Sequence, residues 1–88
     1  PMSQPMMPKA TALWLIENTA LSFDQIADFC GIHSLEVQAL ADGDVMGDMA
    51  PLDPVLNNQV TAEEIKRCEA DPEARPRFVR TEIPQPQA

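Results

Sequence analysis

The sequence predicts an all-α fold, which consists of a three-helix helix-turn-helix core and an additional C-terminal helix. Apolar residues recur at helical spacing in three stretches between residues 9 and 45. Capping patterns begin at Ser22 and Thr61. The stretch "ADFCGIHSLEVQAL" has the residue spacing of a helix-turn-helix. The length of 88 residues allows one small domain but not two independent cores.

Proline and glycine divide the chain into several parts. The nine prolines gather near the start, the middle and the end, so we expect a compact block with irregular flanks. The methionines near the start indicate either a contact surface or a loosely ordered terminus. The predicted parts are an irregular arm (1–8), the helix-turn-helix core (9–45), a loop (46–60), a capped fourth helix (61–71) and a Pro- and Arg-containing tail (72–88).

The first helix is predicted to begin at Lys9 and to end near Asn18 or Thr19. The stretch "KATALWLIENTA" places apolar residues at helical spacing, and Trp14 widens this face as a core anchor. The other apolar positions of this face are Ala12, Leu13, Leu15, Ile16 and Ala20.

The second and third helices form the predicted helix-turn-helix. Ser22 is the expected N-cap of the second helix, Gln25 completes a capping box, and Gly31 ends the helix in the left-handed conformation. Ser34 is the expected cap of the third helix, which ends at Gly43. The residues expected to hold the two helices together are Ala27, Gly31, Ile32, Val37 and Leu40.

The fourth helix has the clearest capping pattern in the chain. In "TAEE", we expect Thr61 to accept a hydrogen bond from the first turn and Glu64 to reach back to the backbone of Thr61. Ile65 and Cys68 lie three residues apart and form the apolar contact of this helix. Pro72 ends it.

The charge distribution argues against a DNA-binding motif of the usual kind. The formal net charge is −8, which disfavours general affinity for polyanions or anionic membranes. Between residues 10 and 60 there is no lysine or arginine. The same stretch holds eight acidic residues, which are Glu17, Asp24, Asp28, Glu36, Asp42, Asp44, Asp48 and Asp53.

We therefore expect the third helix to contact a protein, with charge orienting the encounter and exposed apolar groups supplying affinity. Leu35, Phe29 and the loop from Met46 to Met49 are candidates for these apolar groups, although each of them also suits the core. The expected partner-binding residues are His33, Ser34, Leu35, Glu36, Gln38 and Asp42.

Two alternatives remain open. In the first, Gln38 bonds an adenine edge while Arg75, Arg77 and Arg80 hold the phosphates, although those arginines also suit a solvated tail beside its own acids. In the second, the first or fourth helix forms a homodimer.

No motif for catalysis, a cofactor or a metal stands out, so we expect neither an enzyme nor a cofactor. Cys30 and His33 have a zinc-like interval that Cys68 extends, but no fourth soft ligand is evident. The absence of a membrane span and of a signal sequence predicts a cytoplasmic protein with reduced thiols.

Several phrases of the sequence resemble the alphaproteobacterial family of cell cycle transcriptional regulators called TrcR. The resemblance runs from Met2 to Arg75, and "ALSFDQIADFCG" and "CEADP" are its distinctive parts. It implies a bacterial cytoplasmic protein that acts on transcription in association with RNA polymerase. We therefore expect RNA polymerase or another transcription factor as the protein partner. Family members are longer, with a more basic C-terminal part that holds a second helix-turn-helix, so this chain is expected to be a fragment or a short relative.

Overall fold

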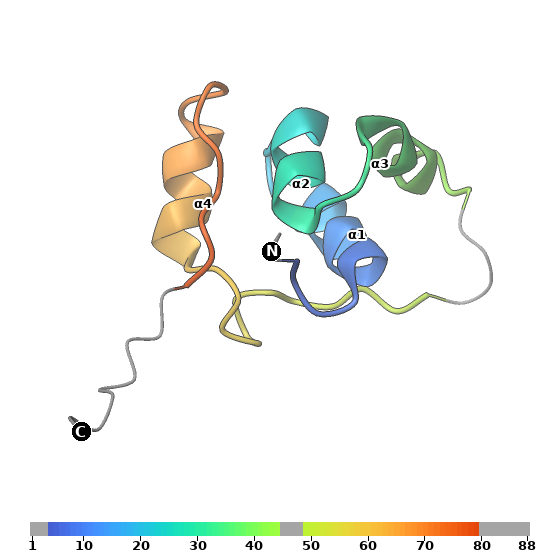
Figure 1. Ribbon diagram of the computed structural model, residues 1–88, viewed down its shortest axis with the longest axis horizontal. Coiled ribbons are helices and arrows are strands. Elements are labelled where there is room, and N and C mark those ends of the chain that lie inside the picture. Colours follow the sequence, from blue (N-terminus) through green and yellow to red (C-terminus); the bar gives the residue numbers. More distant parts are fainter. Residues whose placement is uncertain (1–3, 45–48, 80–88) are drawn as a thin grey trace, which may run out of the picture.

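The computed structural model describes residues 4–44 and 49–79, and within these ranges every regular element is a helix. The chain order is α1 (Pro8–Asn18), α2 (Phe23–Cys30), α3 (Ser34–Ala41) and α4 (Ala62–Glu69). Figure 1 shows α1, α2 and α3 gathered together, with α4 beside them. The predicted all-α fold of three packed helices plus a fourth is confirmed.

One apolar core joins the three packed helices to α4. Each of α1, α2 and α3 packs against the other two. Ile65 and Cys68 bring α4 into the same core. The remaining buried members are Ala12, Leu15, Leu21, Ile26, Ala27, Phe29, Cys30, Val37, Leu40 and Val60. No helix within the described ranges is long and apolar enough to cross a membrane.

Helix α1 begins one residue before the predicted start, because Pro8 occupies the first helical turn, where its missing N–H costs nothing. Trp14 is half-buried against the core, as expected of an anchor. The apolar face does not extend to Ala20, which is exposed and lies beyond the helix. The backbone N–H of Ala20 donates instead to the Glu69 carboxylate at 2.7 Å.

The residues before α1 contact both the motif and the loop that precedes α4. The Gln4 side-chain amide donates to the Gly31 carbonyl oxygen at 3.1 Å. The hydroxyl of Thr11 donates to the Met6 carbonyl oxygen at 2.6 Å, and the Met6 N–H donates to Gln59 Oε1 at 3.4 Å. These contacts fix residues 4–7 over the turn of the motif.

Helix α2 begins and ends as its sequence predicts. The Ser22 hydroxyl accepts from the Gln25 N–H at 3.1 Å, and Gln25 Oε1 accepts from the Ser22 N–H at 2.9 Å. Gly31 has φ 67°, which an L-side chain rarely adopts, and this left-handed residue ends the helix.

Helix α3 is capped by a different residue from the one predicted. Ser34 is the first helical residue, while His33 is the N-cap, and His33 Nδ1 accepts from the Leu35 N–H at 3.0 Å. The correction follows from backbone geometry, because His33 has the extended conformation of an N-cap. Gly43, with φ 84°, follows the end of the helix as expected.

Helix α4 has only half of the predicted capping box. The Thr61 hydroxyl accepts from the Glu64 N–H at 3.0 Å. Glu64 does not reach back to Thr61, because its carboxylate is bound by Arg67 and by the backbone N–H of Arg77.

The segment after α4 turns back and runs along that helix (Figure 1). The rings of Phe29 and Phe78 stack with centroids 4.4 Å apart, and Pro76 is buried. Phe29 itself is only 1% exposed, so it is a core residue and not an exposed contact for a partner. Pro76 and Phe78 thus pack on the fold, whereas Arg75 and Arg77 of the same segment are exposed.

Candidate functional site

The exposed side of α3 carries the residues that the sequence indicated for partner binding. Buried Val37 and Leu40 fix the inner side of the helix against the core. Leu35 projects outward with 68% of its surface exposed. We call this surface the α3 face, which consists of His33, Ser34, Leu35, Glu36, Gln38 and Asp42.

The α3 face is acidic but not free of a neighbouring cation. Lys9 Nζ, at the start of α1, lies 3.7 Å from Glu36 Oε2, and both side chains are about half exposed or more. An exposed pair of this kind contributes little to stability, and water and salt screen it. Asp42 is exposed at the C-terminal end of α3. Glu36 and Asp42 therefore remain accessible to a basic partner.

The remaining motif residues lie where the spacing placed them. Ala27 is 8% exposed, and half-buried Ile32 packs against the core after the turn. The Ile32 N–H donates to the Ala27 carbonyl oxygen at 3.1 Å, which closes the end of α2.

Arg75 lies beside the start of α3 and not in a distant tail. It lines an open hollow of about 520 Å³ with His33 and Ser34. Its guanidinium group donates to the carbonyl oxygens of Pro72 at 2.9 Å and Ala74 at 3.0 Å. The other residues that line this hollow are Asp24, Ala27, Asp28, Gly31 and Ile32. Two carboxylates thus share the hollow with its one arginine.

The structure does not gather the complete set of residues indicated for DNA. Gln38 and Arg77 do not line the hollow that holds Arg75. The Arg77 backbone N–H donates to Glu64 Oε2 at 2.8 Å, and the side chain of Arg77 is exposed. Arg80 lies outside the described residues.

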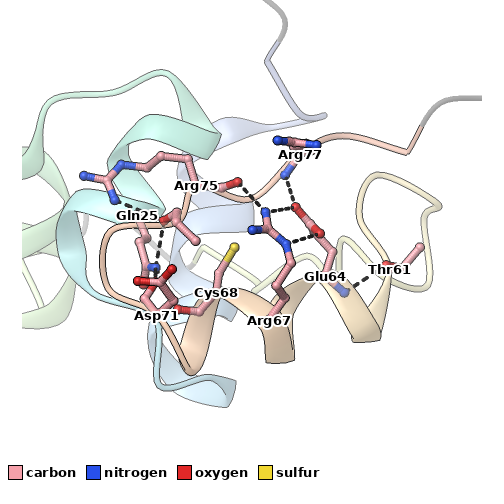
Figure 2. A network of polar contacts seen from close by, with 9 residues as sticks. Gln25, Thr61, Glu64, Arg67, Cys68, Asp71, Arg75 and Arg77 are labelled. Carbon is pink, nitrogen blue, oxygen red and sulfur yellow. Dashed lines mark hydrogen bonds and ion pairs between the residues drawn. The ribbon is translucent and has the colours of Figure 1, made fainter.

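Gln25 has a second role that sequence reasoning missed. Its side-chain Nε2 donates to the carbonyl oxygens of Cys68 at 2.8 Å, Ala74 at 2.9 Å and Asp71 at 3.0 Å. Figure 2 shows this amide pointing towards the chain around the end of α4. The sequence assigned Gln25 to the capping box of α2. No sequence signal indicated that its side chain also bonds to residues near the end of α4.

Glu64 is the centre of a second polar cluster at this end of the fold (Figure 2). Its carboxylate accepts from Arg67 at 2.9 and 2.7 Å, and the Arg67 guanidinium also donates to the Arg75 carbonyl oxygen at 3.1 Å. The hydrogen bonds from Arg67, followed by the bond from the Arg77 backbone, lower the pKa of Glu64 to about 2. This cluster fixes the returning segment against α4.

The two thiols are buried and unpaired. Burial raises the pKa of Cys30 to about 12 and also raises the pKa of Cys68. His33, the third residue of the zinc-like interval, uses Nδ1 to cap α3. In the described parts of the chain, no three His, Cys, Asp or Glu side chains are grouped to hold a metal ion.

Comparison with known families identifies the chain. Residues 35–88, which include all of α3 but its first residue and the whole of α4, match the family described as transcriptional cell cycle regulator TrcR. Comparisons with curated proteins and with solved structures gave no match. Because the match covers more than half of the chain, the chain belongs to the TrcR family.

Proposed function

We propose that this chain, a transcriptional cell cycle regulator of the TrcR family, acts mainly by protein contact through its α3 face. RNA polymerase or another transcription factor is the proposed partner, and a basic region of that partner is the proposed counterpart of the α3 face. On this proposal the chain works by binding, without a catalytic step, in the cytoplasm of a bacterial cell.

The observation that carries the proposal is the chemistry of the α3 face. A helix that reads DNA needs cations next to the phosphates, because phosphate contacts supply most of the affinity. Here Glu36 and Asp42 are exposed, and α2 and α3 contain no lysine or arginine. Leu35 adds the exposed apolar side chain that a protein contact uses as an anchor.

A nuclease-treated pull-down with the whole chain as bait tests this proposal. We expect RNA polymerase subunits or a transcription factor to be recovered after DNA is digested. The double charge reversal Glu36→Lys and Asp42→Lys should reduce recovery at least about tenfold, because it places cations opposite a basic partner. Glu17→Lys is the matched control, since Glu17 is exposed on α1 outside the α3 face. Recovery that is lost on nuclease treatment would contradict the proposal.

DNA binding is a second candidate, because Arg75 lies beside the start of α3. Asp24 and Asp28 line the same hollow and oppose a phosphate there. DNA binding requires an affinity that falls steeply with salt and a loss of sequence preference in Gln38→Ala. Fluorescence anisotropy with labelled promoter DNA at several salt concentrations measures both.

A homodimer is a third candidate, in which α1 or α4 supplies the interface. Light scattering distinguishes it, because a dimer doubles the mass without any added partner. The net charge of −8 on each copy opposes such an association at low salt.

A further inference from the structure

A second surface lies next to the α3 face, and its chemistry is apolar. It is a hollow of about 350 Å³ whose lining is almost entirely apolar. The lining residues are Met7, Pro8, Lys9, Ala10, Ile32 and Met49. Lys9 contributes its aliphatic stem, while its ammonium group lies 3.7 Å from Glu36. We call this surface the methionine hollow.

Met7 is held in an unfavourable conformation at the rim of this hollow. It has φ 44° and ψ 71°, in the left-handed region that glycine and asparagine adopt more readily. Its side chain is 65% exposed and provides no cap for α1, so the fold gains little from a methionine here. Strained residues of this kind are found where they serve a binding site.

Methionine side chains suit an apolar docking surface, because they are flexible and polarizable and adapt to the group that they contact. Ile32 lines the hollow together with Met7 and Met49 and is half-buried against the core. The hollow thus includes a residue from the turn of the motif, and its lining residue Lys9 is paired with Glu36.

Charge decides between the occupants that an apolar hollow admits. A second copy of this chain carries the same net charge of −8, so two copies repel each other. A basic protein segment is attracted by the same negative charge, and the carboxylate paired with Lys9, that of Glu36, can exchange this partner for a cation of that segment. A segment with an apolar side chain between two basic residues suits this surface. The apolar side chain matches the apolar hollow, and the basic residues match the negative charge around it.

We infer that the methionine hollow receives one apolar side chain from a basic segment of the partner protein. The inference rests on the proposed function, because it takes the partner to be a protein that also contacts the α3 face. The hollow would supply affinity and register, while the acidic surroundings orient the segment.

Methyl NMR of the whole chain with ¹³C-labelled methionine tests the inference without the natural partner. The probe is a short lysine- and arginine-rich peptide with one central leucine. We expect it to shift the methyl signals of Met7 and Met49. The same peptide with serine at the centre should bind about tenfold more weakly, since it lacks the apolar group. A glutamate-rich peptide with the same leucine should leave both signals unchanged.

Two variants complete the experiment. Met7→Asn removes the apolar group and places a residue that tolerates the left-handed conformation, so the fold should remain at least as stable. We expect this variant to bind the leucine peptide about fivefold more weakly. Leu56→Ser is the control, since Leu56 is 79% exposed and does not line the hollow.

The inference is overturned if the leucine peptide leaves Met7 and Met49 unshifted, or if the acidic peptide binds equally well. Undiminished binding to Met7→Asn would also overturn it. A dimer that forms without peptide and is lost in Met7→Asn would make a second copy the occupant. None of these results depends on recovering RNA polymerase, so failure of this inference and failure of the proposed function remain distinguishable.

Discussion

The side-chain Nε2 of Gln25 lies 2.8 Å from the backbone oxygen of Cys68, and this contact joins the start of α2 to the end of α4. The two residues are 43 positions apart in the chain. Gln25 is only 1% exposed, so its amide must find protein partners for all its polar atoms. It does so by combining a local capping bond to Ser22 with bonds to the segment that follows α4.

Replacing Gln25 by glutamate should destabilise the fold strongly. Gln25→Glu keeps an oxygen for the Ser22 N–H but places a carboxylate against three carbonyl oxygens that lose the hydrogen bond from residue 25. We expect a loss of about 3 kcal/mol in the free energy of unfolding at pH 7, measured by urea denaturation. This loss in the free energy of unfolding should be smaller at acid pH, because the protonated carboxyl group is neutral and has one hydrogen to donate.

Ser22→Ala is the control for that experiment, because it removes only the local cap. Its expected loss is about 1 kcal/mol, independent of pH. If Gln25→Glu costs no more than Ser22→Ala, the bonds to residues 68–74 do not stabilise the fold.

Glu64 should make the stability depend on acid pH. Its folded-state pKa is lowered from 4.5 to about 2, chiefly by the Arg67 hydrogen bonds. A lowered pKa means that the stabilisation is present above pH 4.5 and is lost as the pH falls towards 2. Glu64→Gln should lower the free energy of unfolding at pH 7 by roughly 1 kcal/mol, a modest amount because solvent screens the pair.

Urea titrations of wild type and Glu64→Gln between pH 6 and pH 2 measure this dependence. The difference between the two proteins should shrink as the pH falls. Glu63→Gln is the matched control, since Glu63 is an exposed neighbour in the same turn. A difference between wild type and Glu64→Gln that is constant over this pH range would contradict the assignment.

Phe78 should hold the returning segment on the fold. Phe78→Ala removes the ring that stacks on Phe29, and we expect a cost of roughly 2 kcal/mol, since Phe78 is half-buried. Limited digestion with trypsin gives a local readout at the bond after Arg77, whereas the bond after Arg75 is followed by proline and resists cleavage.

We expect cleavage after Arg77 to be about tenfold faster in Phe78→Ala than in wild type. Phe23→Ala is the control, because Phe23 is 40% exposed and lies on α2. Equal cleavage rates in Phe78→Ala and wild type would show that the stacked pair does not hold the segment.

The buried thiol of Cys30 should make the fold sensitive to alkaline pH. Burial raises its pKa from 9.0 to about 12. A raised pKa means that the stabilisation is complete below pH 9 and is lost as the pH rises towards 12. Cys30→Ala should therefore lose less stability between pH 8 and pH 11 than wild type does, in guanidinium denaturation at each pH. Parallel losses in the two proteins would refute this prediction.

Local signals in the sequence predicted the helices well. The capping pair Ser22 and Gln25 and the glycines at 31 and 43 act within a few residues, and each lies where it was expected. The predicted cap of α3 was wrong by one residue, since His33 and not Ser34 is the N-cap, and the capping box of α4 failed because other residues bind Glu64. Glu64 accepts hydrogen bonds from Arg67 and from the backbone N–H of Arg77 instead of bonding to Thr61. Arg77 lies near Glu64 only because the segment after α4 folds back.

The candidate site was predictable only in outline. The apolar periodicity of α3 indicated which side faces solvent, so the α3 face could be named from the sequence. The sequence could not place Arg75 beside that helix, because the placement depends on a segment that folds back after α4. The methionine hollow likewise brings together Met7 and Met49, which are far apart in the sequence. No local sequence pattern predicts that these two residues line one surface.

The contacts of Gln25 also determine when its hydrogen bonds can form while the chain is being synthesised. Its amide partners lie at residues 68–74, which leave the ribosome long after α2 and α3. Until then, a nascent chain offers this amide no protein acceptor, and the polar group is left facing an incomplete core. The start of α2 therefore completes its polar contacts only when the chain beyond α4 has been made.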